Sequence, residues 1–366
     1  MKIVERMIMV AFIILNVIIF AKAEDLTSKQ ADLFGVETLE NAVPKETEKI
    51  LGDIDLGLLQ EWPEKFRKLI LYAVEKMVAY LYEGLRTAVS LSVTVILCQT
   101  IDSFSTKPSR IAVRCGGALS VTAVCLSQLK FMIDVGKHAI IELAEFSMTL
   151  NPVMAAAASA AGASASSSIN YIASVFFVQF LLRVSTRLLI PLLFCYLALS
   201  LADTLMENNR LKQIRDFIGC GTEIILKGSV YCFSGCLAVT GILAGSVDAA
   251  KLKATKTAMS AMIPVVGGIV SNAAQTVLAS AALLKNAVGT YGMLVVIALF
   301  LSPFLHLSVY WLYFKIISIL SGVLCSPLTM LLETMGKILG YLMGMTGSGA
   351  LMCLISCCCY LKVVQF

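Results

Sequence analysis

The chain has 366 residues, of which 58% are hydrophobic and only 14% are charged. Its mean hydropathy is +0.85, whereas about a quarter of the residues in soluble domains are charged. A water-soluble globule of this composition would expose large apolar patches, so we exclude that class of protein. The net charge of +5 is spread along the chain and lacks the concentrated basic face that nucleic-acid binding needs. We therefore expect an all-α, polytopic helical membrane protein that binds no nucleic acid.

Residues 1–23 have the pattern of a secretory signal peptide. Lys2 and Arg6 precede an apolar core at residues 7–20, and Ala21-Lys22-Ala23 forms a small-residue cleavage site. An uncleaved anchor is the alternative, but the core is shorter than the roughly 20 residues that cross a bilayer. We expect cleavage after Ala23, which would place the mature N-terminus outside the cytoplasm.

Residues 24–84 form a predicted extracytoplasmic segment, and residues 85–366 form the predicted multispanning domain. From Pro63 to residue 84, apolar residues recur at spacings of three and four. This pattern predicts an amphipathic helix that lies along the outer membrane surface. A second interfacial helix is predicted at residues 134–150, and Asn151-Pro152 is expected to end it because proline interrupts helices.

Eight apolar stretches are candidates for membrane spans. They occupy residues 85–101, 112–133, 169–182, 188–202, 224–244, 287–305, 309–330 and 341–361. We expect seven or eight spans, together with one or two re-entrant segments. Counting outward from a cleaved leader places the basic residues 210–215 outside, against the tendency of Lys and Arg to stay in the cytoplasm. The number of spans, and hence the side of the C-terminus, therefore stays open.

Small residues are concentrated in two places where helices are expected to pack closely. Residues 155–168 are almost all Ala, Ser or Gly, and Gly336, Gly340 and Gly344 recur at every fourth residue. Small side chains allow helix backbones to approach each other in lipid. The glycine row is therefore predicted to be a helix-packing face.

The chain also contains a segment with mixed polarity at residues 251–292. Its first part is a predicted interfacial helix, ended by Pro264, with basic residues at Lys251, Lys253 and Lys256. A tract of small and polar residues follows and includes Gly267, Gly268, Ser271, Asn272, Gln275, Lys285 and Asn286. Polar backbone at membrane depth persists only where protein or a water-filled cavity surrounds it. We therefore expect a re-entrant or buried element whose residues serve lining or packing.

An internal repeat of residues 111–205 and 223–317 is one interpretation of the proline positions. Pro152 and Pro264 lie 112 residues apart, and so do Pro191 and Pro303. Duplicated units build many transporters, with the pathway between them. Chance matches are common in a chain this rich in alanine and valine, so the repeat is left open.

Charged residues near the apolar runs have two interpretations. Lys227 and Lys315 are expected to extend from span ends to the interface. Lys285 adjoins Asn286 and follows a polar tract, so lining of a path and contact with a partner remain equally open for it.

Nothing in the sequence indicates catalysis, so we expect no enzyme, no cofactor and no metal site. Most of the twelve cysteines fall in apolar runs, where a thiol packs as a small hydrophobe. The serine-rich tract around Gly162 would need a nearby histidine to act as a protease. The two histidines, His138 and His306, lie in contexts that do not match such a site.

The segment from residue 263 to 289 resembles the stage III sporulation protein AE family. Pro264, the pair Gly267 and Gly268, and Lys285-Asn286 occur in the family's order. One departure is that the family usually has acidic residues where this chain has Asn272 and Gln275. Any role that needs charge at those two positions is therefore in doubt.

The resemblance implies a transmembrane core component of a channel, or feeding-tube, complex in the mother-cell membrane around the engulfed forespore. Its implied partners are the other stage III sporulation A proteins, including an ATPase subunit, the forespore stage II sporulation protein Q, and a membrane insertase of the Oxa1/YidC type. Residues 265–289 would then line a path for small solutes, and the chain would be the permease. A scaffold without a pore and an independent small-solute secondary transporter remain as alternatives.

Overall fold

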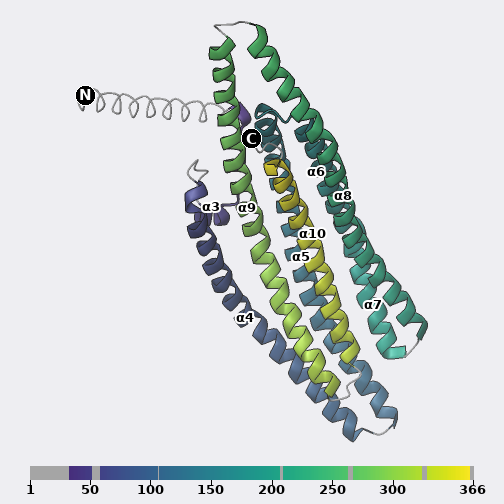
Figure 1. Ribbon diagram of the computed structural model, residues 1–366. Helices are drawn as coiled ribbons and strands as arrows, with labels where there is room; N and C mark the ends of the chain where they lie inside the picture. The colour runs from purple at the N-terminus through teal and green to yellow at the C-terminus, as the bar shows by residue number, and fades with distance from the viewer. Residues whose placement is uncertain are drawn as a thin grey trace.

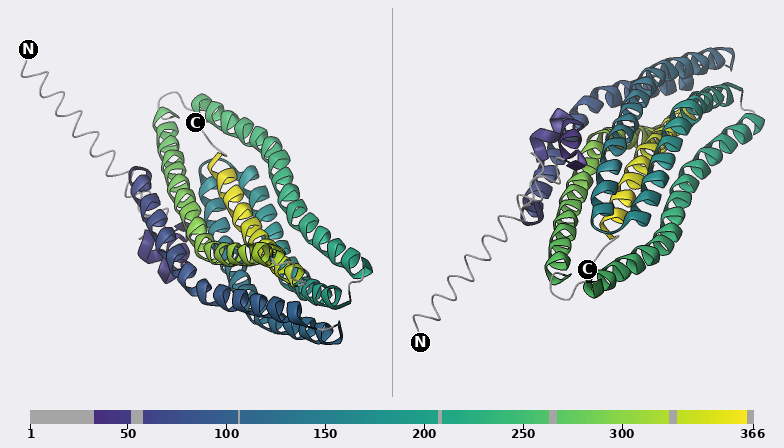
Figure 2. Two further views of the ribbon diagram at one scale, coloured as in Figure 1. Left: turned by 90° about the horizontal axis from the view of Figure 1, so that it is seen from below. Right: turned by 90° about the horizontal axis from the view of Figure 1, so that it is seen from above.

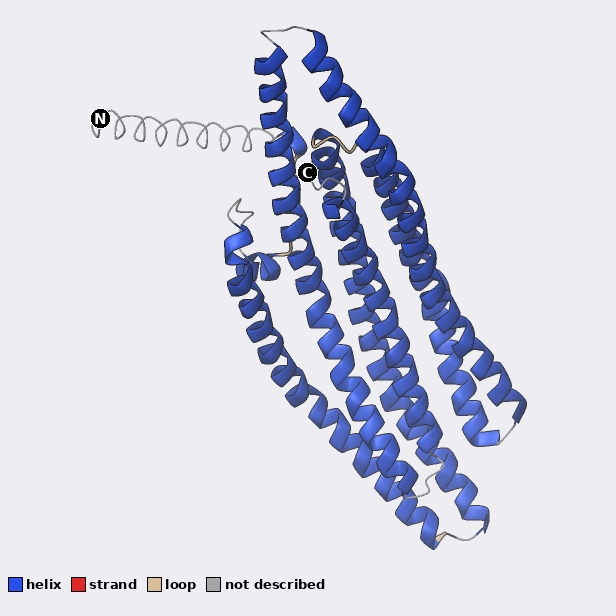
Figure 3. Cartoon of the chain, in the orientation of Figure 1, coloured by secondary structure: helices blue, strands red, loops and turns tan. Residues whose placement is uncertain are grey.

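The computed structural model describes residues 33–51, 58–105, 107–206, 209–262, 267–323 and 328–362. Within them the regular elements are all helices, drawn blue in Figure 3, so the predicted all-α class is confirmed. In chain order these are α2 Val36–Asn41, α3 Lys45–Leu51, α4 Leu58–Phe104, α5 Lys107–Ala160, α6 Ser164–Val184, the π-helical turn η1 Ser185–Leu189, α7 Ile190–Met206, α8 Asn209–Met262, α9 Gly267–Val323 and α10 Thr329–Lys362. The predicted signal peptide at residues 1–23 lies outside the described residues.

The long helices run side by side and alternate in direction along the chain (Figure 1). Helix α10 contacts α5, α6, α7, α8 and α9, and Figure 2 shows it in the middle of the bundle. Helix α4 lies at the edge, where its main contacts are with α3, α5 and α9. The short helix α3 also contacts α9, so the N-terminal elements cover one side of the bundle.

Six stretches of the described residues are long and apolar enough to cross a membrane. They are Pro63–Phe104, Cys115–Ala160, Ser164–Thr204, Leu211–Val239, Leu278–Val323 and Thr329–Lys362. In the most apolar part of each stretch, 56% of the residues are buried in α10 and 50% in α9, but only 22% are buried in α4. Helices α9 and α10 therefore form the core, and α4 turns most of its apolar surface toward lipid. The multi-pass membrane character is confirmed.

The number of candidate spans is smaller than predicted because two pairs of predicted spans are single helical runs. The stretches at residues 169–182 and 188–202 are joined through η1. Helix α9 likewise runs without a break from the stretch at 287–305 into the stretch at 309–330, which it contains as far as Val323. The prediction separated the first pair at Arg183 and Arg187 and the second pair just after Pro303. Neither place is a loop.

The π-helical turn explains how the chain stays helical before Pro191. Proline lacks a backbone N–H and its ring displaces the carbonyl of the residue four positions earlier. In η1 the N–H of Ile190 donates to the carbonyl of Ser185, five residues back. The wider π turn thus rearranges the hydrogen bonds next to the proline, and the helix continues into α7.

The predicted helix end at Asn151-Pro152 is wrong, because α5 continues through Pro152 to Ala160. The chain reverses instead at residues 161–163, where Gly162 has φ 98°, a left-handed conformation that favours glycine. Across this turn the hydroxyl oxygens of Ser159 and Ser167 lie 2.5 Å apart. The small-residue tract at 155–168 is therefore a helical hairpin between α5 and α6.

The two predicted interfacial helices are not separate elements. Residues 63–84 continue into the following span as α4, and residues 134–150 are an internal part of α5. Only part of the apolar period from Pro63 onward packs in the bundle, since Leu69 is buried whereas Phe66, Ile70 and Met77 are exposed. At the end of this stretch the Tyr313 hydroxyl of α9 donates to the Leu81 carbonyl of α4 at 2.7 Å. A helical period by itself does not distinguish a membrane surface from a neighbouring helix.

The segment of mixed polarity divides between two long helices. Helix α8 ends at Met262 and α9 begins at Gly267, so the predicted break at Pro264 falls outside the described residues. From Gly267 onward the tract is the first part of one continuous helix, and the described residues contain no separate re-entrant element there. When the two units of the proposed repeat are aligned at their 112-residue offset, the turn at residues 161–163 corresponds to a position inside α9. The helix ends therefore do not coincide, and the repeat stays a prediction.

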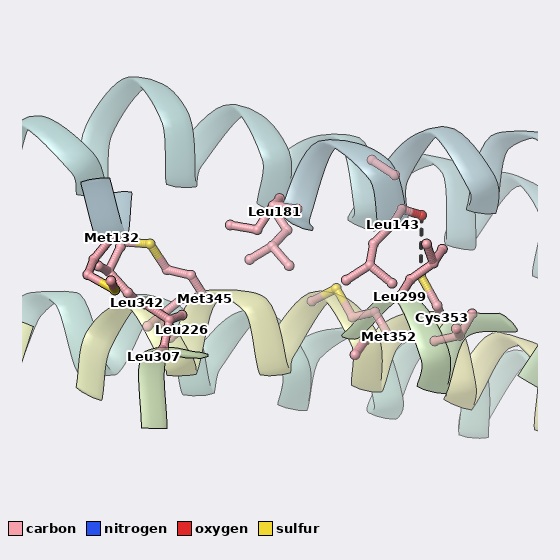
Figure 4. Packing of buried hydrophobic residues seen from close by; sticks show 14 of the residues in the cluster. Met132, Leu143, Leu181, Leu226, Leu299, Leu307, Leu342, Met345, Met352 and Cys353 are labelled. Carbon is pink, nitrogen blue, oxygen red and sulfur yellow. Dashed lines mark hydrogen bonds between the residues drawn. The ribbon is translucent and has the colours of Figure 1, made fainter. Parts of the chain in front are cut away.

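The core between the helices consists of interlocking aliphatic and sulfur-containing side chains. Figure 4 shows Leu143 of α5, Leu181 of α6 and Leu299 of α9 close to Met352 and Cys353 of α10. The Cys353 thiol donates to the Leu143 carbonyl at 3.8 Å. Because lipid is as apolar as leucine, such contacts stabilise the bundle through close packing rather than through removal of surface from water.

Candidate functional site: a polar cavity between α3, α4, α5 and α9

A cavity of about 530 Å³ lies where α3 covers the space between α4, α5 and α9. Cavities that bind small molecules usually measure about 300–1,000 Å³, so this one has room for a solute. It brings together both histidines of the chain, His138 from α5 and His306 from α9. Sequence reasoning treated these two residues as unrelated, since nothing in their spacing shows that α5 and α9 are neighbours.

His306 is held among aromatic rings. Its side chain is buried and stacks on Tyr80 of α4, with ring centroids 4.1 Å apart and an interplanar angle of 5°. Phe131 of α5 meets it edge-on at 5.5 Å. The Nε2 atom lies 3.7 Å from the Glu83 Oε2 atom, which is too long for a hydrogen bond. Among the described residues Nε2 has no hydrogen-bond partner.

Polar contacts and one close approach hold helix α4 against α9. The hydroxyls of Tyr80 and Ser302 lie 2.7 Å apart, and Tyr313 donates to the Leu81 carbonyl. Gly84 lies directly under the Tyr313 ring, where a Cβ atom would be only 2.6 Å from Cε2. Glycine therefore allows the close approach of α4 and α9 at this position.

The ionisable residues of the lining come mostly from one face of α5. Asp134, His138 and Glu142 recur at spacings of four, which places them on the same side of the helix. Lys45 of α3 adds one positive charge. From the sequence, this face of α5 was predicted to lie at a membrane interface, so the cavity was not predicted. In this part of α5, charged residues alternate with buried ones, and this pattern was the available indication that the charged face borders a cavity.

Lys285, for which two roles were left open, contacts a neighbouring helix. Its side chain is completely buried, and Nζ donates to the Leu361 carbonyl at 3.2 Å. Leu361 lies in the last turn of α10, where carbonyl groups lack helical partners and carry the negative end of the helix dipole. The lysine thus stabilises the C-terminus of α10. Neither of the cavities discussed here is lined by Lys285 or by Asn286, which is half-buried.

The glycine row of α10 packs closely at only one of its three positions. A Cβ at Gly344 would lie 3.3 Å from Leu226 of α8, whereas Gly336 and Gly340 have nothing within 4 Å. Gly340 and Gly344 instead line a second cavity, of about 880 Å³, between α7, α8 and α10. The row is therefore partly a helix contact and partly the wall of a groove.

The remaining predicted residues cannot be placed at the level of side chains. Pro264 lies outside the described residues, and the structure describes only the helical backbone for the others. These are Lys251, Lys253, Lys256, Gly267, Gly268, Ser271, Asn272 and Gln275. Their predicted roles stay predictions.

A buried polar network was missed by the sequence analysis. Asn151 of α5 donates to Ser147 at 2.9 Å and accepts from Ser356 of α10 at 3.0 Å. Ser356 also lies 2.6 Å from the Ser174 hydroxyl of α6. The network joins three helices in the core, where a polar side chain without a partner would be costly. Asn151 was interpreted only as a helix breaker, because its partners are distant in the sequence.

The fold defines an integral helical-bundle membrane protein, with a half-open cavity between α3, α4, α5 and α9. Comparison with known proteins identifies its family. The chain belongs to the stage III sporulation protein AE family, whose family model matches residues 46–363. This confirms the resemblance seen in the sequence and indicates a role in sporulation.

One relative illustrates how far the similarity extends. The chain is 24% identical over 234 residues to stage III sporulation protein AE of Bacillus subtilis (strain 168). The alignment covers 64% of this chain and 59% of that relative, so it spans less than two thirds of the relative's length. No solved structure matches the chain.

Proposed function

We propose that this protein is the transmembrane core component of a channel complex linking the mother cell and the engulfed forespore, and that it acts there as the permease. Membership of the family supports the sporulation role. The observation that carries the transport role is the cavity between α3, α4, α5 and α9, which is lined by charged and apolar residues, is large enough for a solute and lies between helices long and apolar enough to cross a membrane. The protein would have no enzymatic activity of its own.

The position of α4 supports a path that opens at this cavity. Helix α4 lies at the edge of the bundle, and its contacts with α9 include the Tyr80–Ser302 and Tyr313–Leu81 hydrogen bonds. A peripheral helix held in this way separates from its neighbours more easily than the central α10, which is packed on all sides. Movement of α4 relative to α9 would connect the cavity with its surroundings.

The proposed setting is the mother-cell membrane, with the signal peptide removed. The proposed partners are the other stage III sporulation A proteins, including an ATPase subunit, and the forespore stage II sporulation protein Q. An insertase of the Oxa1/YidC type would place the chain in the membrane. In this proposal the ATPase partner supplies the energy for transport.

Filling the cavity tests the proposed function. Ser302 lines the cavity, so Ser302→Phe should obstruct it and reduce late forespore gene expression, measured with a forespore reporter. Ile319→Phe is the matched control, because Ile319 is an exposed residue of the same helix. Both variants must reach the membrane at the wild-type level. Normal reporter expression in a correctly inserted Ser302→Phe protein would contradict a transport path through this cavity.

A scaffold without a pore is the second candidate, and the buried network around Asn151 favours it. That network and the Lys285 contact lock α5, α6, α9 and α10 together without lining the cavity. A scaffold would tolerate Ser302→Phe, but it would lose function when Asn151 is replaced and the helices separate. The two candidates therefore predict opposite results for the cavity variant.

A further inference from the structure

We propose that the outward face of α6, η1 and α7 around Arg183 and Arg187 docks a transmembrane helix of another protein, and that this helix carries carboxylates at the depth of the two arginines. The inference goes beyond the transport role proposed for the cavity and does not depend on it. It rests on the depth of the arginines in the membrane, on the face from which they project and on the absence of a counter-charge for them among the described residues.

The two arginines lie inside a membrane span. The candidate span Ser164–Thr204 contains both of them, between the apolar stretches at residues 169–182 and 188–202. Each of these stretches is shorter than the roughly 20 residues that cross a bilayer as a helix. Because the chain stays helical from one stretch into the other, they cross the membrane together, and the arginines lie between the two membrane surfaces.

The packing of α6 against α10 indicates the same depth. The hydroxyls of Ser174 and Ser356 lie 2.6 Å apart, and a Cβ atom at Gly349 would lie 3.7 Å from the Leu181 side chain. The two helices therefore run antiparallel, and the next turn of the α6–η1 helix is level with the middle of α10, Thr329–Lys362. Either surface of the hydrocarbon core is then about 15 Å away, which is farther than an arginine side chain extends.

The arginines project away from the bundle. Ile172, Phe176 and Phe180 are exposed and recur at every fourth residue of α6. Arg183 and Arg187 continue this row at spacings of three and four, and both of their side chains are exposed. Residues at these spacings share one face of a helix. The row therefore lies on the face that α6 turns away from its neighbours α5, α8 and α10.

Neither arginine forms an ion pair within the part of the chain that the structure describes. Other charged residues of the bundle do form such pairs, for example Arg215 with Asp203 and Lys227 with Glu223. Charged residues at this depth are rare, and they almost always pair with one another or face a water-filled cavity. The arginines line neither of the two cavities discussed above. Because they face outward, the counter-charge that they require comes from outside the bundle.

The chemistry of this face defines its occupant. An arginine binds a carboxylate through two parallel hydrogen bonds. Two arginines one helical turn apart match two Glu or Asp residues that are also one turn apart on a neighbouring helix. The row of Ile172, Phe176 and Phe180 provides apolar contacts along the same line. A hydrophobic helix with two carboxylates near its middle therefore complements this face in both charge and polarity.

Another protein supplies these carboxylates more readily than a second copy of this chain. Glu223 lies in the middle of the candidate span Leu211–Val239, but it already accepts a hydrogen bond from Lys227. Asp134 and Glu142 of α5 line the cavity under α3 instead. A second copy would therefore have to break existing contacts to cover the arginines.

Binding of synthetic transmembrane peptides to the purified, full-length protein tests the proposal. The probe is a helix of about 20 leucines and alanines with two glutamates four residues apart at its centre. Matched peptides carry glutamine or lysine at the same two positions. Energy transfer between labelled protein and peptide measures the affinity in phosphatidylcholine vesicles, which contain no anionic lipid.

The glutamate peptide should bind at least about tenfold more tightly than the other two peptides. Equal binding of the glutamine peptide, or no binding of the glutamate peptide to folded protein, would overturn the proposal.

Variants locate the docking face. Arg183→Gln and Arg187→Gln should each weaken binding of the glutamate peptide by about tenfold, whereas Arg183→Lys should keep most of the affinity. Arg183→Glu combined with Arg187→Glu should reverse the preference, so that the lysine peptide binds more tightly. Lys315→Gln, at an exposed position of α9, is the matched control and should leave binding unchanged.

Gel filtration and thermal unfolding check that each variant is folded. A folded Arg183→Gln, Arg187→Gln double variant that still prefers the glutamate peptide would contradict the assignment, and so would equal weakening by Lys315→Gln.

The association state of the protein identifies the alternative occupant. Light scattering in detergent should give the same molecular mass for the wild type and for the Arg183→Gln, Arg187→Gln double variant. A wild-type dimer that becomes a monomer in the double variant would show that this face binds a second copy, and the assignment to another protein would be wrong.

The outcomes are separate from those of the proposed function. If the glutamate peptide fails to bind while Ser302→Phe still reduces forespore expression, the cavity remains a path and the docking face is wrong. If the peptide binds at the arginines while Ser302→Phe leaves expression normal, the docking face is correct and the transport role is wrong.

Discussion

The buried lysine in α9 shows how a single charged residue changes its interpretation once its neighbours are known. In the sequence, Lys285 lies next to a polar tract, and a path-lining role was as reasonable as a partner contact. In the structure its ammonium group reaches only the carbonyl end of α10 among the contacts described. A buried ammonium group loses its hydration, and this cost offsets most of the gain from one hydrogen bond.

Replacement of Lys285 by methionine should therefore be tolerated. Methionine has a similar length and removes the buried charge, so we expect the free energy of unfolding to change by only about 1 kcal/mol or less. Thermal unfolding in detergent measures this, with Lys315→Met, at an exposed position of the same helix, as the control. Forespore reporter expression should also persist. Its loss in a stable, inserted Lys285→Met protein would restore a path-lining role for Lys285.

The network around Asn151 makes the opposite prediction for a neutral polar residue. Asn151→Leu leaves the hydroxyls of Ser147 and Ser356 without their amide partner, so we expect a loss of about 1 kcal/mol, the usual range for polar contacts between membrane helices. Combination with Ser356→Ala should cost less than the sum of the two single changes, because both remove the same contact. Additive losses in thermal unfolding would show that the two residues act separately.

At the scale of elements, composition and hydropathy predicted that the chain would be helical, but they did not predict where its helices end. Pro152 and Pro303 were expected at or near helix ends, yet both lie inside long helices. The actual reversal at Gly162 depends on a left-handed backbone conformation and on contacts between α5 and α6, which a local pattern does not reveal. The cavity was not predicted for the same reason, because His138 and His306 line one cavity only when α5 and α9 pack together.

The fit of α4 against α9 can be tested at one glycine. In Gly84→Ala the new Cβ would lie 2.6 Å from the Tyr313 ring, and Tyr313 is held by its hydrogen bond to Leu81. We expect the free energy of unfolding to fall by about 1–3 kcal/mol from overpacking, because the Tyr313 ring or α4 must move to make room; thermal unfolding in detergent measures this loss. Gly116→Ala is the control, since nothing lies within 4 Å of its Cβ. That variant should gain about 0.5–1 kcal/mol from helix propensity.

At the scale of the whole molecule, the lengths of the helices exceed the thickness of a bilayer. Helices α5 and α8 have 54 residues each, which corresponds to about 80 Å, whereas the hydrocarbon core measures about 30 Å. Both helices must therefore extend well beyond the hydrocarbon region. Each of these helices can therefore carry many charged residues and still contain a span. From the sequence, the charged parts were predicted to be separate interfacial helices.

The six candidate spans also resolve the conflict over the basic residues 210–215. Residues 164–204 form one candidate span rather than two, and the connection between α7 and α8 lies at the same end of the bundle as the connection between α4 and α5 (Figure 1). Lys107 and Arg110 follow one connection, and Arg210 and Lys212 follow the other. From the tendency of basic residues to remain in the cytoplasm, we predict that this end of the bundle faces the cytoplasm.

Reporter fusions test this orientation. A fluorescent protein fused after residue 106 or 207 should fluoresce, because it folds in the cytoplasm, whereas alkaline phosphatase at these points should be inactive. Fusions after residue 162 or 264 should give the reverse pattern, since those connections lie at the opposite end of the bundle. The start of α4 would then lie outside, as a cleaved signal peptide requires. Phosphatase activity after residue 207 together with fluorescence after residue 106 would show that residues 164–204 cross the membrane twice, and the cavity would then need a different set of neighbouring helices.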